Sequence, residues 1–274
     1  MVEPARLSLN TATVRERWTL RQCIEGCARH GIGGISPWRD MLAACGVAEA
    51  ARLIQDHGLT VTGLCRGGMF PAATASGFQR NLDDNRRAID EAAAIGARCL
   101  VLVVGGLPEG SKSLAGARAQ VREGIAAVLD HARRAGIPLA IEPLHPMYAG
   151  DRSCVTSLAE ANDLCDALGP GVGIALDVYH VWWDAALARE IVRAGRERLL
   201  AFHVCDWLVP TRDLLFDRGM MGDGVIDIPL IRRMVEAVGY DGLIEVEIFS
   251  RDHWWKEDPD EVLRTLIARA RTSI

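Results

Sequence analysis

The chain has 274 residues, of which 49% are hydrophobic and 24% charged, enough for one large core or two small ones. Its formal net charge of −5 gives no electrostatic reason to expect a nucleic-acid partner, and no apolar run approaches the roughly 18 residues of a membrane-spanning helix. The N-terminal residues lack the basic start and apolar stretch of a signal peptide, so we expect a cytoplasmic protein with no membrane partner. The eight cysteines include no CxxC pair, and we expect buried, reduced thiols.

Short apolar runs typical of strands alternate with amphipathic runs typical of helices along the whole chain. The expected strands lie within residues 6–12, 31–38, 59–68, 98–106, 137–145, 171–180, 198–206 and 241–250. Helices are indicated at 20–30, in the segment that ends at 57, at about 83–95 and at 115–135. Gly96 and Gly136 follow the last two helices, as glycines often do where a helix ends.

Eight β units, each followed by a helical segment, are typical of a (β/α)8 barrel, the TIM barrel, which usually needs about 250 residues. The strands are apolar at nearly every position, as expected when both of their faces are covered. A doubly wound open sheet also alternates strands and helices, but it usually has a glycine-rich phosphate loop after its first strand, and this chain has none. No linker or low-complexity segment divides the chain, so we expect one domain over residues 1–274.

Four successive strands end in residue types that bind metal ions. Glu142 closes the fifth expected strand, Asp177 the sixth, His203 the seventh and Glu247 the eighth. The carboxyl ends of barrel strands surround a common mouth, where converging charges need a counter-charge. Each residue alone could be a cap or an ion-pair partner, but four at equivalent positions favour a single divalent metal ion. Three carboxylates and one imidazole suit Mn²⁺, which we expect, or Co²⁺, Mg²⁺ or Zn²⁺.

Glu245 precedes Glu247 by two residues, so both side chains point to the same side of the eighth strand. The residue nearer the carboxyl end of the strand belongs in the site, which selects Glu247. We expect Glu245 to lie one layer deeper, where an arginine or another hydrogen-bond donor has to compensate its charge.

Four segments at these strand ends resemble one known family. IEPLHP, ALDVYHVWWD, AFHVCDW and GLIEVEIFS are similar to the sugar isomerase/epimerase branch of the xylose isomerase-like barrel superfamily, and the resemblance covers essentially the whole chain. In the ketose 3-epimerases of this family, the four residues that match those described above hold one Mn²⁺ or Co²⁺. The resemblance also implies that His180 and an arginine after the seventh strand, here Arg212, contact substrate hydroxyls. The endonucleases of the superfamily use additional histidines after strands two, three and seven, and these are missing here.

The reaction implied is proton abstraction next to a sugar or sugar-phosphate carbonyl through a metal-stabilised enediolate, with Glu142 and Glu247 as catalytic carboxylates. Return of the proton to the opposite face of the carbon gives an epimerase, and return to the adjacent carbon gives an isomerase. Loss of a leaving group gives a lyase or dehydratase, for example on an oxidised glycoside or a hydroxy-keto acid. These outcomes stay open, as does a barrel that only binds a partner, although all four ligand positions are filled.

Six of the seven tryptophans follow expected strands at the mouth, which favours a small-molecule sugar or glycoside as substrate. Among them, Trp38 and Trp182 are candidate substrate contacts, with loop packing or a subunit interface as the alternative. His145 could bind a substrate hydroxyl or stabilise its loop. Arg66, like Arg152, could meet a phosphate or carboxylate or be a solvated surface charge. Homo-oligomers are common among the proteins that this chain resembles.

Overall fold

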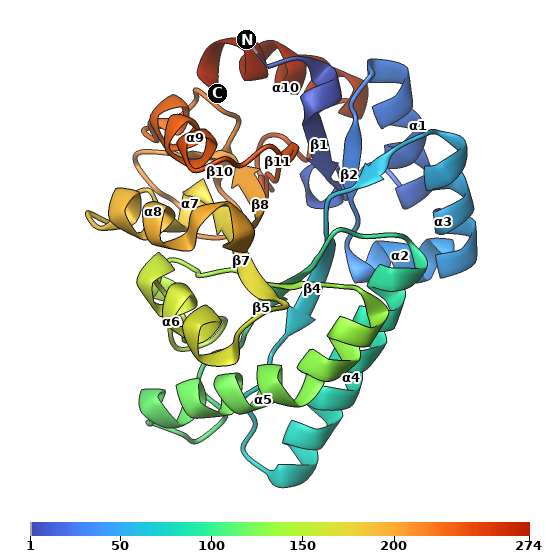
Figure 1. Cartoon of the computed structure of the whole chain (residues 1–274). Helices are drawn as coiled ribbons and strands as arrows, with labels where there is room; N and C mark the ends of the chain where they lie inside the picture. The colour runs from blue at the N-terminus through green and yellow to red at the C-terminus, as the bar shows by residue number, and fades with distance from the viewer. Residues whose placement is uncertain (1) are drawn as a thin grey trace.

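The computed structural model describes residues 2–274, and its strands enclose a barrel (Figure 1). Nine parallel strands of this range form one sheet in the order β3-β2-β1-β11-β8-β7-β6-β5-β4. They are β1 (Leu7–Asn10), β2 (Gly34–Ser36), β3 (Thr60–Val61), β4 (Leu64–Gly68), β5 (Leu100–Val103), β6 (Leu139–Ile141), β7 (Val172–Asp177), β8 (Leu199–Val204) and β11 (Ile244–Val246). The eight expected β units and the TIM barrel are confirmed, with the third unit split into β3 and β4.

The split third unit closes the barrel, because its two pieces pair with different neighbours. β3 pairs with β2, and β4 pairs with β5. Between the pieces, the amide of Thr62 still donates to Ile35 of β2 at 3.0 Å, whereas the amide of Leu64 donates to Cys99, next to β5, at 3.1 Å. The amide of Cys65, in β4, donates to Pro37, next to β2, at 2.9 Å, so the third unit is hydrogen-bonded to both of its neighbours.

Helices follow the strands and cover the outside of the barrel (Figure 1). The α-helices of the described residues are α1 (Leu20–His30), α2 (Arg39–Cys45), α3 (Val47–Asp56), α4 (Ala75–Ala94), α5 (Leu114–Ala135), α6 (Leu158–Leu168), α7 (Val178–Val181), α8 (Leu187–Arg198), α9 (Ile228–Ala237) and α10 (Pro259–Ser273). α1 has the expected bounds, and Gly136 ends α5 in the left-handed conformation with a φ of 68°. α4 begins earlier than expected, because the side chain of Thr74 accepts a hydrogen bond from the amide of Gly77 and caps the helix there.

The two largest hydrophobic clusters differ in composition. Large aliphatic residues such as Leu7, Leu9 and Ile35 are fully buried in the main hydrophobic cluster. A second, smaller cluster consists mainly of small side chains from the strands: Cys65, Cys99, Val101, Ala140, Ala175 and Ala201. Small residues leave room for polar groups inside the barrel. All eight cysteines are free, and seven of them are buried, as expected.

Outside the barrel sheet, two short strands form an antiparallel pair near the mouth. They are β9 (Asp206–Trp207), which follows β8, and β10 (Arg218–Gly219), and Arg218 lies opposite Trp207 in their register. Short 3-10 helices cover Pro4–Arg6, Thr11–Thr13 and Pro146–Tyr148. Within residues 2–274, no helix combines the length and apolar character required to cross a membrane.

Candidate active site

A cavity of about 430 Å³ lies at the carboxyl ends of the strands. Five arginines line it: Arg15, Arg66, Arg152, Arg218 and Arg251. Aromatic side chains form much of the remaining wall: Trp38, Tyr148, Phe216, Phe249 and Trp255. Of the residues predicted to act in catalysis or substrate binding, five reach the cavity: Trp38, Arg66, Glu142, His180 and Glu247.

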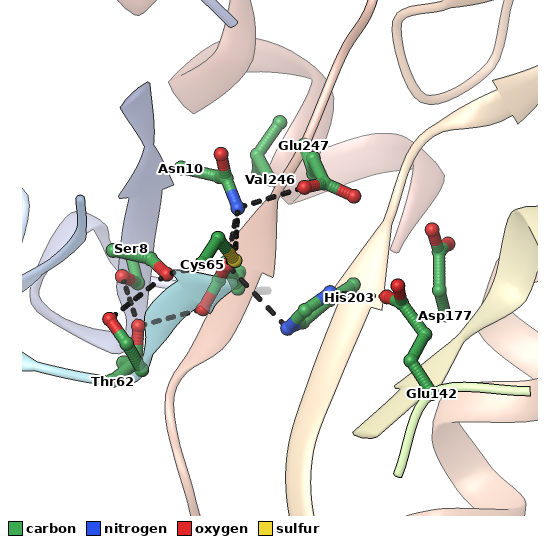
Figure 2. A network of polar contacts seen from close by, with 12 residues as sticks. Ser8, Asn10, Thr62, Cys65, Glu142, Asp177, His203, Val246 and Glu247 are labelled. Atoms are coloured by element: carbon green, nitrogen blue, oxygen red, sulfur yellow. Dashed lines mark hydrogen bonds and ion pairs between the residues drawn. The ribbon is translucent and has the colours of Figure 1, made fainter. Parts of the chain in front are cut away.

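The four predicted metal ligands converge beside this cavity (Figure 2). Glu142 follows the last residue of β6, Asp177 ends β7, His203 lies in β8, and Glu247 follows the last residue of β11. Each is buried, and one ligand atom from each lies within 4.8 Å of the others. The parallel register of neighbouring strands explains the convergence, since Asp177 of β7 lies directly opposite His203 of β8.

Several polar atoms in this cluster have no hydrogen-bond partner within the described part of the chain. They are Oε1 of Glu142 and both ring nitrogens of His203. The nearest acidic oxygens lie 3.3 Å from Nδ1, on Glu142, and 3.4 Å from Nε2, on Glu245. Buried polar atoms are rarely left without a partner, and each one costs stability. Three carboxylates and an imidazole with unpaired atoms therefore fit a divalent metal ion.

The cluster also has more negative than positive charge. Arg218 supplies the guanidinium nearest to it, with Nη1 3.1 Å from Oδ2 of Asp177 and 3.3 Å from Oε2 of Glu247. Burial raises the pKa of Asp177 to about 6 and that of Glu247 to about 7, although Arg218 opposes both shifts. Burial alone would lower the pKa of His203, but the surrounding carboxylates, Glu245 foremost, raise it to about 10. A bound cation would relieve the same imbalance that these shifts report.

Asn10, at the end of β1, fixes two of the buried glutamates (Figure 2). Its Nδ2 donates to Oε1 of Glu245 at 2.7 Å and to Oε1 of Glu247 at 2.9 Å. Its Oδ1 accepts a hydrogen bond from Nε1 of Trp38 at 2.9 Å. Thr62 donates to the other oxygen of Glu245 at 2.7 Å, so that carboxylate lies deeper in the barrel and is hydrogen-bonded, as expected. No role in the site was predicted for Asn10 from the sequence, although Asn10 lies at the end of its strand, as the candidate metal ligands do at or near the ends of theirs.

His180 lies in α7, the short helix that begins directly after Asp177. Its Nδ1 lies 3.2 Å from the backbone amide nitrogen of His145, and its Nε2 lies 3.3 Å from Nη2 of Arg218. Nε2 lies 3.7 Å from Oδ2 of Asp177. Burial lowers the pKa of His180 well below its usual value, and the charge of Arg218 adds to the effect. The imidazole is therefore neutral.

Arg212 lies outside the residues that line the cavity. Its side chain is 67% exposed, and its guanidinium donates to Asp217 at 2.7 Å and 3.1 Å. The arginine of this loop that reaches the cavity is Arg218, because pairing of β10 with β9 holds it over the mouth. Its guanidinium lies 4.4 Å from the ring centre of Tyr179 and 5.1 Å from that of Phe249. The neighbouring sequence does not distinguish the two arginines, because apolar residues precede both, at 208–210 before Arg212 and at 214–216 before Arg218.

Trp182 and His145 also lie outside the cavity lining. The Trp182 ring packs 5.8 Å from that of Trp207, between loops. The ring of His145 packs 5.0 Å from Trp207, and its Nδ1 accepts from the amide of Met147, which caps a 3-10 helix. Trp183 is 40% exposed and donates to the backbone carbonyl of His180 at 2.8 Å. These side chains stabilise the loops that hold His180.

The barrel fold and the buried cluster of carboxylates and a histidine at its mouth together indicate the class of protein. A model of the xylose isomerase-like TIM barrel family matches residues 24–268, and the chain belongs to this family. The resemblance seen in the sequence is thereby confirmed.

Individual relatives agree over nearly the whole chain. The crystal structure of protein SMc04130 from Sinorhizobium meliloti 1021 is 61% identical, covers 97% of this chain and 98% of its own, and superimposes with a TM-score of 0.96. An inosose isomerase from Bacillus velezensis is 23% identical over 277 residues, covering 95% of this chain and 94% of the relative. A crystal structure of the IolI protein with a bound zinc atom is 19% identical, covers 96% of both chains and has a TM-score of 0.83.

Proposed function

We propose that this chain is a divalent-metal-dependent isomerase or epimerase that moves a proton next to the carbonyl group of a sugar or a sugar derivative. The observation that carries this proposal is the placement of two buried carboxylates, Glu142 and Glu247, on the wall of one cavity beside a cluster with unpaired ligand atoms. The inosose isomerase among the relatives supports the reaction class.

Four residues would hold the cation: Glu142, Asp177, His203 and Glu247. We expect Mn²⁺, and the zinc atom bound in the IolI structure, which shares this fold, supports a divalent ion. When bound, the ion polarises the substrate carbonyl and makes the neighbouring C–H bond more acidic. Asn10 would keep Glu247 in place through its hydrogen bond of 2.9 Å.

Glu142 and Glu247 would carry the proton from opposite sides of the substrate. Glu142 follows β6 and Glu247 follows β11, and β7 and β8 lie between these strands in the sheet. A carboxylate on one face removes the proton, and the other can return one from the opposite face, which inverts the carbon. Return to the adjacent carbon by either residue gives the isomerase reaction.

Other cavity residues would orient the substrate. His180 offers a neutral imidazole, and Arg218 offers guanidinium protons to hydroxyl or carbonyl oxygens. The rings of Trp38 and Phe249, 5.5 Å apart and nearly perpendicular, supply flat apolar surface for the C–H face of a sugar.

The test is incubation of the Mn²⁺-loaded protein in D₂O with a panel of ketoses, inososes, ketose phosphates and 3-keto-glycosides. We expect deuterium at the carbon next to the carbonyl in a recovered epimer or isomer, detected by NMR and mass spectrometry. An Asp177→Asn variant serves as the control and should incorporate none. Release of a leaving group without deuterium in recovered substrate would instead show a lyase, and no exchange with any compound would contradict the proposal.

A further inference from the structure

The five arginines of the cavity differ in how their charges are compensated. Arg15 pairs with Asp40, Arg251 pairs with Asp213 at 3.4 Å, and Arg218 pairs with two metal-ligand candidates. The other two, Arg66 and Arg152, form no side-chain hydrogen bond or ion pair with any residue of the range 2–274. Two guanidinium groups therefore face the cavity without a carboxylate partner.

Arg66 and Arg152 come from neighbouring parts of the barrel mouth. Arg66 lies in β4, and Arg152 lies in the loop after β6, which bridges to the segment after β5 through Gly105 and Ser153. Both are partly buried. Burial lowers the pKa of Arg66, and the charge of Arg152 lowers it further. Like charges that share a partly buried cavity destabilise each other unless an anion lies between them.

The hydroxyl group of Tyr148 adds a third unpaired group to this side of the cavity. It is buried and has no hydrogen-bond partner among the described residues. The Tyr148 ring lies 5.7 Å from the guanidinium carbon of Arg152, and both residues line the cavity. A buried hydroxyl without a partner is a donor that a ligand can satisfy.

We propose that Arg66, Arg152 and Tyr148 bind an anionic group of the substrate, so that the enzyme acts on an acidic sugar derivative rather than on a neutral sugar. The group is a carboxylate or a phosphate, since guanidinium groups bind both through paired hydrogen bonds. This inference rests on the proposed function. The metal-ligand candidates lie on β7 and β8 and directly after β6 and β11, so the substrate would extend from them toward β4.

The test measures binding, so that it does not depend on turnover. D-glucuronate, D-glucose 6-phosphate and D-glucose are titrated into the Mn²⁺-loaded protein by isothermal titration calorimetry. We expect at least one of the two anions to bind at least tenfold more tightly than D-glucose. Arg66→Gln and Arg152→Gln should each weaken the binding of that anion by roughly 10- to 100-fold and change the binding of D-glucose little. Tyr148→Phe should have a smaller effect in the same direction.

Arg251→Gln is the matched control, because Arg251 also lines the cavity but has an acidic partner. It should leave the preference for the anion unchanged. The tighter of the two anions identifies the group as carboxylate or phosphate. Equal affinity for anion and neutral sugar, no anion binding, or a preference that survives both arginine variants would overturn the inference.

The same measurement separates this inference from the proposed function. Anion binding that depends on Arg66 and Arg152, without deuterium exchange on any substrate, would keep the anion site and remove the isomerase reaction. Deuterium exchange on neutral sugars at a rate that neither arginine variant changes would keep the isomerase reaction and remove the anion site.

Discussion

The mouth of this barrel has an acidic half and a basic half, and the two halves are unbalanced in opposite directions. The acidic half, on β7 and β8 and directly after β6 and β11, gathers carboxylates around His203 with Arg218 as their cationic partner. The basic half, around β4 and the loop after β6, holds Arg66 and Arg152 without an acidic partner. The whole chain is close to balance, with 31 basic and 36 acidic residues. Charge that is unpaired locally indicates where ligands of opposite charge bind.

The acidic half should be the more sensitive to substitution, because the proposed proton transfer takes place there. Glu142→Gln and Glu247→Gln preserve side-chain shape but remove the base, and each should lower the rate of deuterium incorporation by roughly 10²- to 10⁴-fold. Glu123→Gln, on the exposed face of α5, is the control and should keep the wild-type rate. Either site variant with more than about a tenth of the wild-type rate would exclude a two-carboxylate mechanism.

Arg218 and Arg212 both pair with acids, but only Arg218 is buried. Arg218→Met leaves buried carboxylates without their partner and should lower the free energy of unfolding of the cation-free protein by about 3–5 kcal/mol. Arg212→Met removes an exposed pair and should lower it by less than about 1 kcal/mol. Urea unfolding in the presence of a chelator measures both. Similar values for the two variants would mean that Arg218 does not compensate the acidic half.

Asn10 supports the acidic half from β1. Asn10→Ala removes the donor to Glu245 and Glu247, and the affinity for Mn²⁺ should fall by roughly 10- to 100-fold. Asn162→Ala is the matched control, because Asn162 is also buried and bonded to a glutamate, Glu190, but lies in α6. It should lower stability without changing Mn²⁺ affinity. An equal loss of affinity in both variants would point to a general loosening of the fold.

Substitution of Trp38 should have the smallest effect, since phenylalanine keeps an aromatic ring in the cavity wall. Trp38→Phe removes the hydrogen bond of 2.9 Å to Oδ1 of Asn10 and should lower the free energy of unfolding by about 0.5–1.5 kcal/mol. Trp254→Phe is the comparison, because Nε1 of Trp254 has no partner within residues 2–274. Thermal unfolding should therefore show a larger loss of stability for Trp38→Phe than for Trp254→Phe. A larger loss for Trp254→Phe would contradict the role given to Trp38.

The barrel could be predicted from the sequence because eight apolar runs at regular intervals are a property of the chain itself. The division of the third run into two strands was not visible in the sequence. It depends on how the backbone of residues 61–65 is hydrogen-bonded to both neighbouring strands, and no residue type there signals it.

The metal-ligand candidates could be selected because each stands at or near the end of its own strand, where the fold alone determines position. Arg218 was missed in favour of Arg212, since both lie in one long loop and only the pairing of β9 with β10 brings one of them to the cavity. Asn10 occupies a strand end and could have been identified by the same rule. His145 and Trp182 follow strands too, but their rings pack in the surrounding loops, which strand position cannot reveal.

The most direct test of the account is the number of Mn²⁺ ions bound per chain, measured by elemental analysis after equilibrium dialysis. The geometry of the acidic half predicts one ion per chain in the wild-type protein and none at the same free Mn²⁺ concentration in Asp177→Asn, whose side chain has the same shape without the charge. Glu123→Gln should bind one ion. A wild-type protein that binds no stoichiometric ion, or an Asp177→Asn variant that binds as the wild type does, would contradict the metal site on which the proposed reaction depends.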